Sequence, residues 1–106
     1  MGTVASAPHV VFASFTFKSV ELKNDFVSML RGPDGLRVTR AAPGCRLIEC
    51  LAVNDEERTI VLRQEWDTPA DHVAYYQQRV ESGMIEHLGT MMDDEVSISR
   101  LTKLDI

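Results

Sequence analysis

Apolar and β-branched residues gather in four short runs along the chain, and polar or turn-forming residues bound each run. This pattern predicts four β-strands. The runs are His9–Phe17, Cys45–Val53, Arg58–Trp66 and Val96–Leu104. The polar residues Asn54–Glu57 separate the second run from the third, so we expect these two strands to form a hairpin.

The segment after the first run has apolar residues at helical spacing, which predicts an amphipathic helix. Ser19 suits the N-cap, because its hydroxyl can accept a hydrogen bond from a free backbone N–H group. The inner stripe of this helix is formed by Leu22, Phe26, Met29 and Leu30. The Gly-Pro-Asp-Gly turn of residues 32–35 ends it, and residues 36–40 then predict a short helical turn.

The segment after the third run has the clearest helix start in the chain. Thr68 suits the N-cap, Pro69 suits the first helical position, and Asp71 is a carboxylate variant of the capping box. We expect this helix to run to Gly83 and a shorter one to follow over Met84–Met92. The predicted inner stripe of the longer helix is Val73, Tyr76 and Val80.

The resulting order is strand, helix, strand, strand, helix, strand, which matches the split β-α-β arrangement of ferredoxin-like proteins. We therefore expect an α+β fold with a four-stranded antiparallel sheet and helices on one face. The length of 106 residues suits a single domain, which we place at residues 9–106. Residues 1–8 lack both a positively charged start and a long apolar run, so we expect a disordered leader there.

Apolar residues occupy both faces of the predicted sheet. Two sets compete for burial, namely Val10, Phe12, Ile48, Cys50 and Ala52 against Val11, Phe15, Leu47 and Leu51. Arg63 and Glu65, with Glu49 across from them, predict a cross-strand ion pair. Because helices cover one face only, a second copy is the simplest cover for the other, and we expect a homodimer packed sheet to sheet.

Composition and charge exclude several classes of function. No run approaches the roughly 20 apolar residues of a membrane-spanning helix. Eleven Lys and Arg against sixteen Asp and Glu give a net charge of −5, and no basic cluster favours binding to nucleic acid or to a membrane surface. Sequence motifs for phosphate binding, zinc hydrolysis and serine hydrolysis are absent.

The two cysteines, Cys45 and Cys50, are five positions apart in one predicted strand. An odd separation in a strand directs two side chains to opposite faces, so we expect no disulfide and no shared metal. Unpaired thiols that behave as small apolar residues are typical of a reducing compartment, which favours a cytoplasmic location.

Three segments together resemble the antibiotic biosynthesis monooxygenase family. They are the strand that ends in Trp66, the capped helix WDTPADHVAYYQQR of residues 66–79 and the upstream APGC of residues 42–45. The resemblance extends from His9 to Leu104 and implies a dimeric ferredoxin-like α+β barrel. Members of that family include cofactor-independent monooxygenases of polyketide phenols, haem-degrading enzymes, quinol oxidases and proteins that process signalling molecules.

The resemblance implies a small homodimeric monooxygenase or oxidoreductase that uses molecular oxygen, without a cofactor or metal, on an aromatic, quinol or polyketide-like molecule. Such chemistry needs a base, donors that stabilise the substrate anion, and a dry apolar pocket. His87 is the candidate base, and Tyr75 or Arg79 are the candidate donors. The candidate substrate-binding residues are Trp66, Phe12, Arg79 and Met84, with Met91 and Met92 as further parts of an apolar wall.

Two other functions stay open. The first is a haem-binding or haem-degrading monooxygenase, in which His87 would match the iron-binding histidine. Against it, Tyr75 stands where haem degraders have Trp, and the first strand contains no Asn. The second is a non-catalytic dimeric module that binds a small ligand or serves a stress response.

Some of these side chains also have purely structural interpretations. His72 is expected to face solvent, and Arg79 is expected on a solvated helix face. Tyr75 and Tyr76 are about 100° apart around the helix axis, so only one of them is expected to face the core centrally. His87 is equally consistent with a half-exposed residue on a short helix.

Overall fold

In the computed structural model, residues 7–106 are described and the elements follow the predicted order. Most of the predicted leader, residues 1–8, lies outside the described residues. The elements are β1 (His9–Thr16), α1 (Val20–Arg31), α2 (Leu36–Ala41), β2 (Cys45–Val53), β3 (Glu56–Trp66), α3 (Pro69–Glu81), α4 (Met84–Met91) and β4 (Ser97–Thr102).

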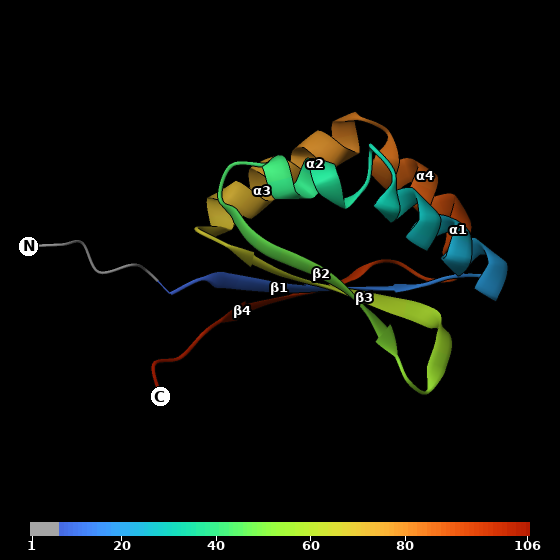
Figure 1. The fold of residues 1–106 in the computed structure, drawn as a ribbon, viewed down its shortest axis with the longest axis horizontal. Coiled ribbons are helices and arrows are strands. Elements are labelled where there is room, and N and C mark those ends of the chain that lie inside the picture. The colour runs from blue at the N-terminus through green and yellow to red at the C-terminus, as the bar shows by residue number, and fades with distance from the viewer. Residues whose placement is uncertain (1–6) are drawn as a thin grey trace, which may run out of the picture.

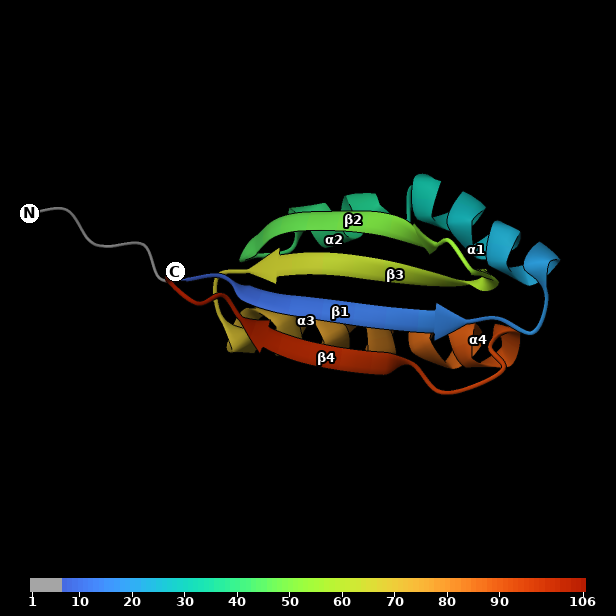
Figure 2. The same ribbon diagram turned by 90° about the horizontal axis from the view of Figure 1, so that it is seen from below.

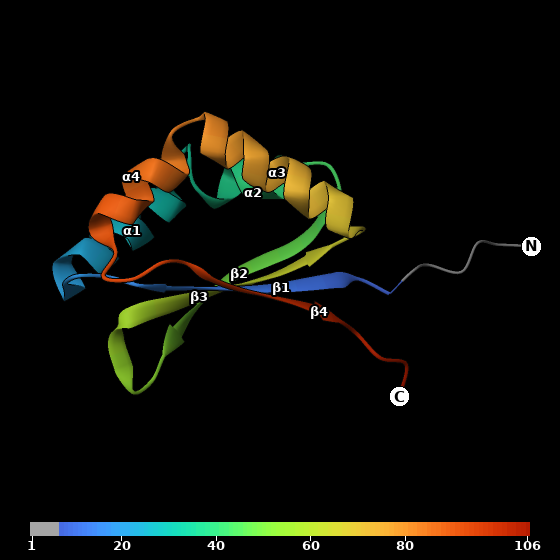
Figure 3. The same cartoon turned by 180° about the vertical axis from the view of Figure 1, so that it is seen from behind.

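The four strands form one antiparallel sheet in the order β2-β3-β1-β4 (Figure 2). All the helices lie on one side of the sheet (Figure 1). α1 and α2 lie toward the β2 edge, and α3 and α4 lie toward the β4 edge (Figure 2), so that α3 and α4 are in front when the molecule is seen from behind (Figure 3). The predicted α+β, ferredoxin-like fold class is confirmed. No helix in the described part of the chain is long and apolar enough to cross a lipid bilayer.

Both main helices begin at the predicted caps. The Ser19 hydroxyl accepts a hydrogen bond from the Leu22 N–H group at 3.1 Å, and the Thr68 hydroxyl accepts one from the Asp71 N–H group at 3.1 Å. Each cap satisfies one backbone donor that the helix itself leaves free, which typically contributes about 1 kcal/mol. Pro69 occupies the first turn of α3, where its missing N–H group costs nothing.

The hydrophobic core lies between the sheet and the helices. β1 and β3 direct alternate residues toward the helices, because successive side chains of a strand point to opposite faces. Phe26 of α1 packs against Phe15 and Phe17, with ring centroids 5.6 and 5.2 Å apart. The other buried members of this core are Ala13, Leu30, Leu36, Ile48, Ile60, Leu62, Leu88 and Met92.

The two predicted sets of sheet residues are divided differently in the structure. Pairing of Ile48 with Gln64 and of Cys50 with Leu62 places Ile48 and Cys50 on the helix-covered face. The residues of the covered face are Val11, Phe15, Ile48, Cys50 and Ala52, whereas Val10, Phe12, Leu47 and Leu51 belong to the open face. The predicted sets were wrong because alternation within each strand does not fix the register between strands.

The two cysteines lie on the same face of the sheet, so the prediction of opposite faces was wrong. Cys45 pairs with Trp66 and Cys50 pairs with Leu62, and a β-bulge separates Cys45 from Leu47. The extra residue of a bulge reverses the alternation beyond it, which turns an odd separation into the same direction. Both thiols are free, and burial raises the pKa of each above its usual value.

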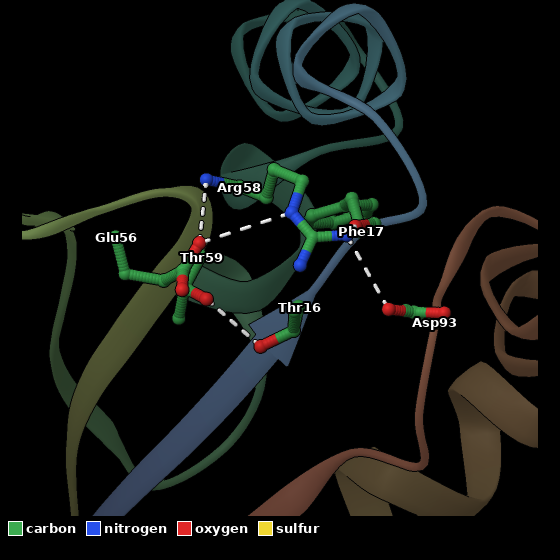
Figure 4. Close-up of polar contacts among 6 residues, drawn as sticks. All are labelled: Thr16, Phe17, Glu56, Arg58, Thr59 and Asp93. Carbon is green, nitrogen blue, oxygen red and sulfur yellow. Dashed lines mark hydrogen bonds and ion pairs between the residues drawn. The ribbon is translucent and has the colours of Figure 1, made fainter.

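Arg58 joins three segments at one end of the sheet (Figure 4). Its Nη1 atom donates hydrogen bonds to the Phe17 carbonyl oxygen and to an Asp93 carboxylate oxygen, each at 3.3 Å. The Thr16 and Thr59 hydroxyls form a further hydrogen bond of 2.8 Å beside it. These contacts hold the connection between α4 and β4 against the end of β1.

The open face combines apolar side chains with an ion-paired centre. Phe12, Leu51 and Leu101 are 38, 40 and 44% exposed. Arg63 forms ion pairs with Glu65 at 2.8 Å and with Glu49 at 3.7 Å, which confirms the predicted cross-strand pair. No element of the described chain covers this face (Figure 1).

Candidate functional site

The candidate site begins with the inner face of α3, which differs from the predicted one. Val73 and Val80 are 45 and 49% exposed, so they do not form the inner stripe. Instead, the side chains that line the interior of the protein are those of His72, Tyr75, Tyr76 and Arg79, which recur at helical spacing. The prediction failed because hydrophobicity alone places valine inside, whereas here the larger polar and aromatic side chains fill the wide space between helix and sheet.

These side chains face a cavity of about 70 Å³ between the sheet and the two rows of helices. Most of its wall is apolar and comes from β1, β3, α1 and α4. The apolar residues of the wall include Phe15, Phe26, Met29, Leu62, Met84, Ile85 and Leu88. The polar residues of the wall include Thr39, Gln64, His72, Tyr75, Tyr76 and Arg79.

The Arg79 guanidinium is the centre of the polar network. Its Nη1 atom donates to the Asp34 carbonyl oxygen and its Nη2 atom to the Gly35 carbonyl oxygen, both at 2.9 Å. Nη2 also donates to the Thr39 hydroxyl at 3.3 Å, and Nε donates to the Tyr75 hydroxyl at 2.7 Å. Arg79 is only 9% exposed, so the prediction that it lies on a solvated face was wrong.

The Arg79 charge has no carboxylate within ion-pair distance among residues 7–106. A buried cation usually requires compensation, and here neutral carbonyl and hydroxyl oxygens provide it. One of these acceptors belongs to Gly35, whose backbone lies so close to Leu30 that a Cβ atom at position 35 would collide with the Leu30 backbone. The positive charge is therefore available to an anion in the cavity.

The two tyrosines both line the cavity, so the prediction that only one faces the core was wrong. The Tyr75 hydroxyl forms a hydrogen bond of 2.6 Å with the Thr39 hydroxyl in addition to the one from Arg79. The Tyr75 ring packs on Trp66, with centroids 5.2 Å apart, and lies 5.3 Å from the Arg79 guanidinium carbon. These contacts hold the Tyr75 hydroxyl in one position at the polar end of the cavity.

Trp66 packs against two residues of the cavity wall, on the side away from the cavity. It is fully buried, and its indole N–H group donates to the Gln64 side-chain oxygen at 2.9 Å. Trp66 is not part of the cavity wall, but it packs against both Tyr75 and His72, which are. It therefore positions two residues that face the cavity.

His72 is buried, with only 3% of its surface exposed, so the prediction that it faces solvent was wrong. Burial lowers its pKa to about 4, and the charges of Arg100 and His9 act in the same direction. The imidazole is therefore neutral at pH 7, and its Nδ1 atom has no hydrogen-bond partner. His72 was not predicted as a site residue, although its spacing of three and seven from Tyr75 and Arg79 places it on the same helix face.

The structure brings together some of the predicted site residues and separates others. Tyr75, Arg79 and Met84 line one cavity. His87 lies outside this cavity on the exposed side of α4, and Phe12 lies on the open face of the sheet. The predicted wall residues Met91 and Met92 pack in the core without lining the cavity.

The described residues do not fit a haem group. His87, the candidate iron ligand, lines a different space on the exposed side of α4 and does not face the cavity.

Comparison with known proteins shows the fold. No protein family model and no curated protein sequence matches the chain. Among solved structures, protein Rv0793 of Mycobacterium tuberculosis has 19% identity and a TM-score of 0.78 over 94% of this chain and 98% of that one. A putative antibiotic biosynthesis monooxygenase of Nitrosomonas europaea has 15% identity and a TM-score of 0.74 over 97% and 96%.

A third structure comes from Streptomyces coelicolor. It is the monooxygenase of the gene ActVA-Orf6 in complex with the ligand nanaomycin D, and it has 14% identity and a TM-score of 0.76. The alignment covers 94% of this chain and 90% of that one. The chain therefore has the fold of the antibiotic biosynthesis monooxygenases, as the sequence resemblance predicted.

Proposed function

We propose that the protein is a small cytoplasmic homodimer that oxidises an electron-rich aromatic molecule, such as a phenol or a quinol, with molecular oxygen and without a cofactor. The observation that carries the proposal is the buried Arg79 guanidinium, which has no carboxylate partner among the described residues and which shares a mainly apolar cavity with the Tyr75 hydroxyl. The resemblance to monooxygenases of the same fold supports it.

The chemistry requires no redox group on the protein. Removal of the phenolic proton gives an anion that Arg79 and Tyr75 stabilise, and this anion passes one electron to O2. The resulting radical pair forms a carbon–oxygen bond para to the phenol oxygen. Loss of water then breaks the O–O bond, so one phenol with a para hydrogen and one O2 give one quinone and one water.

We assign the proton acceptor to His72 in place of the predicted His87, because His72 lines the cavity and is neutral at pH 7. An acceptor must first be within reach of the proton, and its pKa matters second. With a pKa of about 4, His72 is a weak base. It can accept the proton only where Arg79 stabilises the phenolate at the same time.

The experiment that tests the proposal measures oxygen consumption by metal-free protein with a panel of phenols, naphthols and quinols. We expect turnover of at least one of them and a loss of about a hundredfold or more in Arg79→Met, the scale typical of a missing oxyanion donor. Glu86→Ala, on the exposed side of α4, is the matched control and should be unchanged. Saturable binding without oxygen consumption would contradict the proposal and favour a non-catalytic binding module.

A further inference from the structure

A second, larger space adjoins the cavity on the outside of the helical layer. This outer hollow has a volume of about 490 Å³. It is lined by Met29, Asp34, Val38, Gln78, Arg79, Ser82, Gly83, Met84 and His87. Four of these residues, Met29, Asp34, Arg79 and Met84, also line the inner cavity, so the two spaces adjoin at these residues.

The barrier between the two spaces has a fixed part and a movable part. Arg79 is held by hydrogen bonds to the carbonyl oxygens of Asp34 and Gly35. Met29 and Met84 are half-buried, and methionine is unbranched with three rotatable bonds, so these side chains can move aside at low cost. The two methionines are thus suited to act as a gate beside a fixed cation.

The outer hollow differs from the inner cavity in its chemistry. Gln78 and His87 line the hollow and not the cavity, and no hydrogen bond engages either side chain within residues 7–106. The Ser82 hydroxyl, in contrast, already donates to the Arg79 carbonyl oxygen at 2.9 Å. An amide and an imidazole are therefore available to a polar ligand group at the mouth of an apolar space.

We propose that the outer hollow is the polar half of a two-part binding site. Movement of Met29 and Met84 joins the inner cavity of about 70 Å³ to the outer hollow and makes room for the ring of a phenol. A hydrogen-bonding substituent on that ring extends past the two methionines to Gln78 and His87. The substrate class is then a phenol with a neutral polar side chain rather than a plain hydrocarbon one. This inference rests on the proposed function, because it needs a phenol in the inner cavity.

Trp66 provides the signal for the test, because it is the single tryptophan of the chain and packs on Tyr75 at the cavity wall. Two probes are compared by quenching of its fluorescence, 3-propylphenol and 3-(3-hydroxypropyl)phenol, which both keep the para hydrogen that the proposed reaction needs. We expect His87→Ala to weaken binding of the hydroxylated probe about three- to tenfold, the range that one ordinary hydrogen bond represents. Binding of 3-propylphenol should not change.

The gate is tested by the rate of quenching in a stopped-flow instrument. Met29→Ala and Met84→Ala widen the passage and should accelerate association of both probes severalfold. Met91→Ala is the matched control, because Met91 is also a half-buried methionine of α4 but lines neither space. All three variants keep Trp66 as the only tryptophan.

The outcomes separate this inference from the proposed function. If both probes quench Trp66 but the His87 and methionine variants behave like the native protein, the two-part site is wrong while the inner cavity keeps its proposed role. If neither probe binds, both proposals are overturned. A selective loss with the hydroxylated probe, together with faster association in the methionine variants, supports the two-part site.

Discussion

At the scale of single residues, the burial of His72 makes a pH-dependent contribution to stability. The folded state holds its pKa at about 4, whereas the unfolded state restores the usual value of 6.5. Between these two values the unfolded chain binds the proton more tightly than the folded one. Stability is therefore lost as the pH falls from about 6.5 toward 4.

We predict that replacing His72 removes part of this acid sensitivity. The free energy of unfolding in urea, measured at pH 7 and pH 4.5, should fall less between the two values in His72→Gln than in the native protein. The difference should be up to about 3 kcal/mol, since one unit of pKa shift corresponds to 1.36 kcal/mol. His87→Gln is the control on an exposed histidine, and an equal response of the two variants would contradict the prediction.

Residue patterns in the sequence located the site only in part. Tyr75, Arg79 and Met84 were predicted from the resemblance, and they meet in one cavity. The burial of His72 and Arg79 could not be predicted from polarity, because a buried polar group is tolerated only where partners for it exist, and those partners come from elsewhere in the fold. For Arg79 they are two carbonyl oxygens of the connection between α1 and α2.

At the scale of elements, Gly44 joins the start of β2 to the first turn of α3. Its φ angle is +84°, and a Cβ atom there would collide with the Asp71 carboxyl group. Its carbonyl oxygen accepts a hydrogen bond from the Asp67 N–H group at 2.8 Å. We predict that Gly44→Ala lowers the free energy of unfolding by about 1–3 kcal/mol, because a left-handed backbone and a steric collision act together.

Gly89 is the matched control for this prediction. It lies inside α4, and a Cβ atom there would meet nothing within 4 Å. Gly89→Ala should therefore raise stability by about 0.5–1 kcal/mol, as expected for a glycine in a helix interior. Thermal unfolding of the two variants should shift in opposite directions, and a shared direction would count against the steric argument.

Helix caps and strand runs made the order of the elements predictable. Which side chains of each element point toward the core depended on three-dimensional geometry that short sequence patterns do not contain. Ser19 and Thr68 cap α1 and α3 as predicted. The bulge between Cys45 and Leu47 reversed the alternation of β2, and no residue type in that segment signals it. Register and bulges depend on the partner strand, so they become visible only in three dimensions.

At the scale of the whole molecule, the open face of the sheet is the surface through which we propose that two copies assemble. Phe12, Leu51 and Leu101 expose apolar surface there. We predict that Phe12→Asp converts the proposed homodimer to a monomer, because an unpaired carboxylate in a sheet-to-sheet interface would lose its hydration. Light scattering at micromolar concentration gives the mass directly.

The control for assembly is Val73→Asp, which places the same charge on an exposed position of α3, away from the open face. This variant should keep the dimer mass. A native protein that is already monomeric at micromolar concentration would refute the sheet-to-sheet dimer.

The groups that compensate the Arg79 charge also determine how ligand binding depends on pH. Carbonyl and hydroxyl oxygens do not titrate in the physiological range, so no competing counter-ion appears or disappears at this cation as the acidity changes. An arginine paired with a carboxylate would attract anions more strongly once acid discharged its partner. Here the attraction stays constant, so between pH 5 and 8 the contribution of Arg79 to the affinity for a given phenol should change only with the ionisation of the ligand.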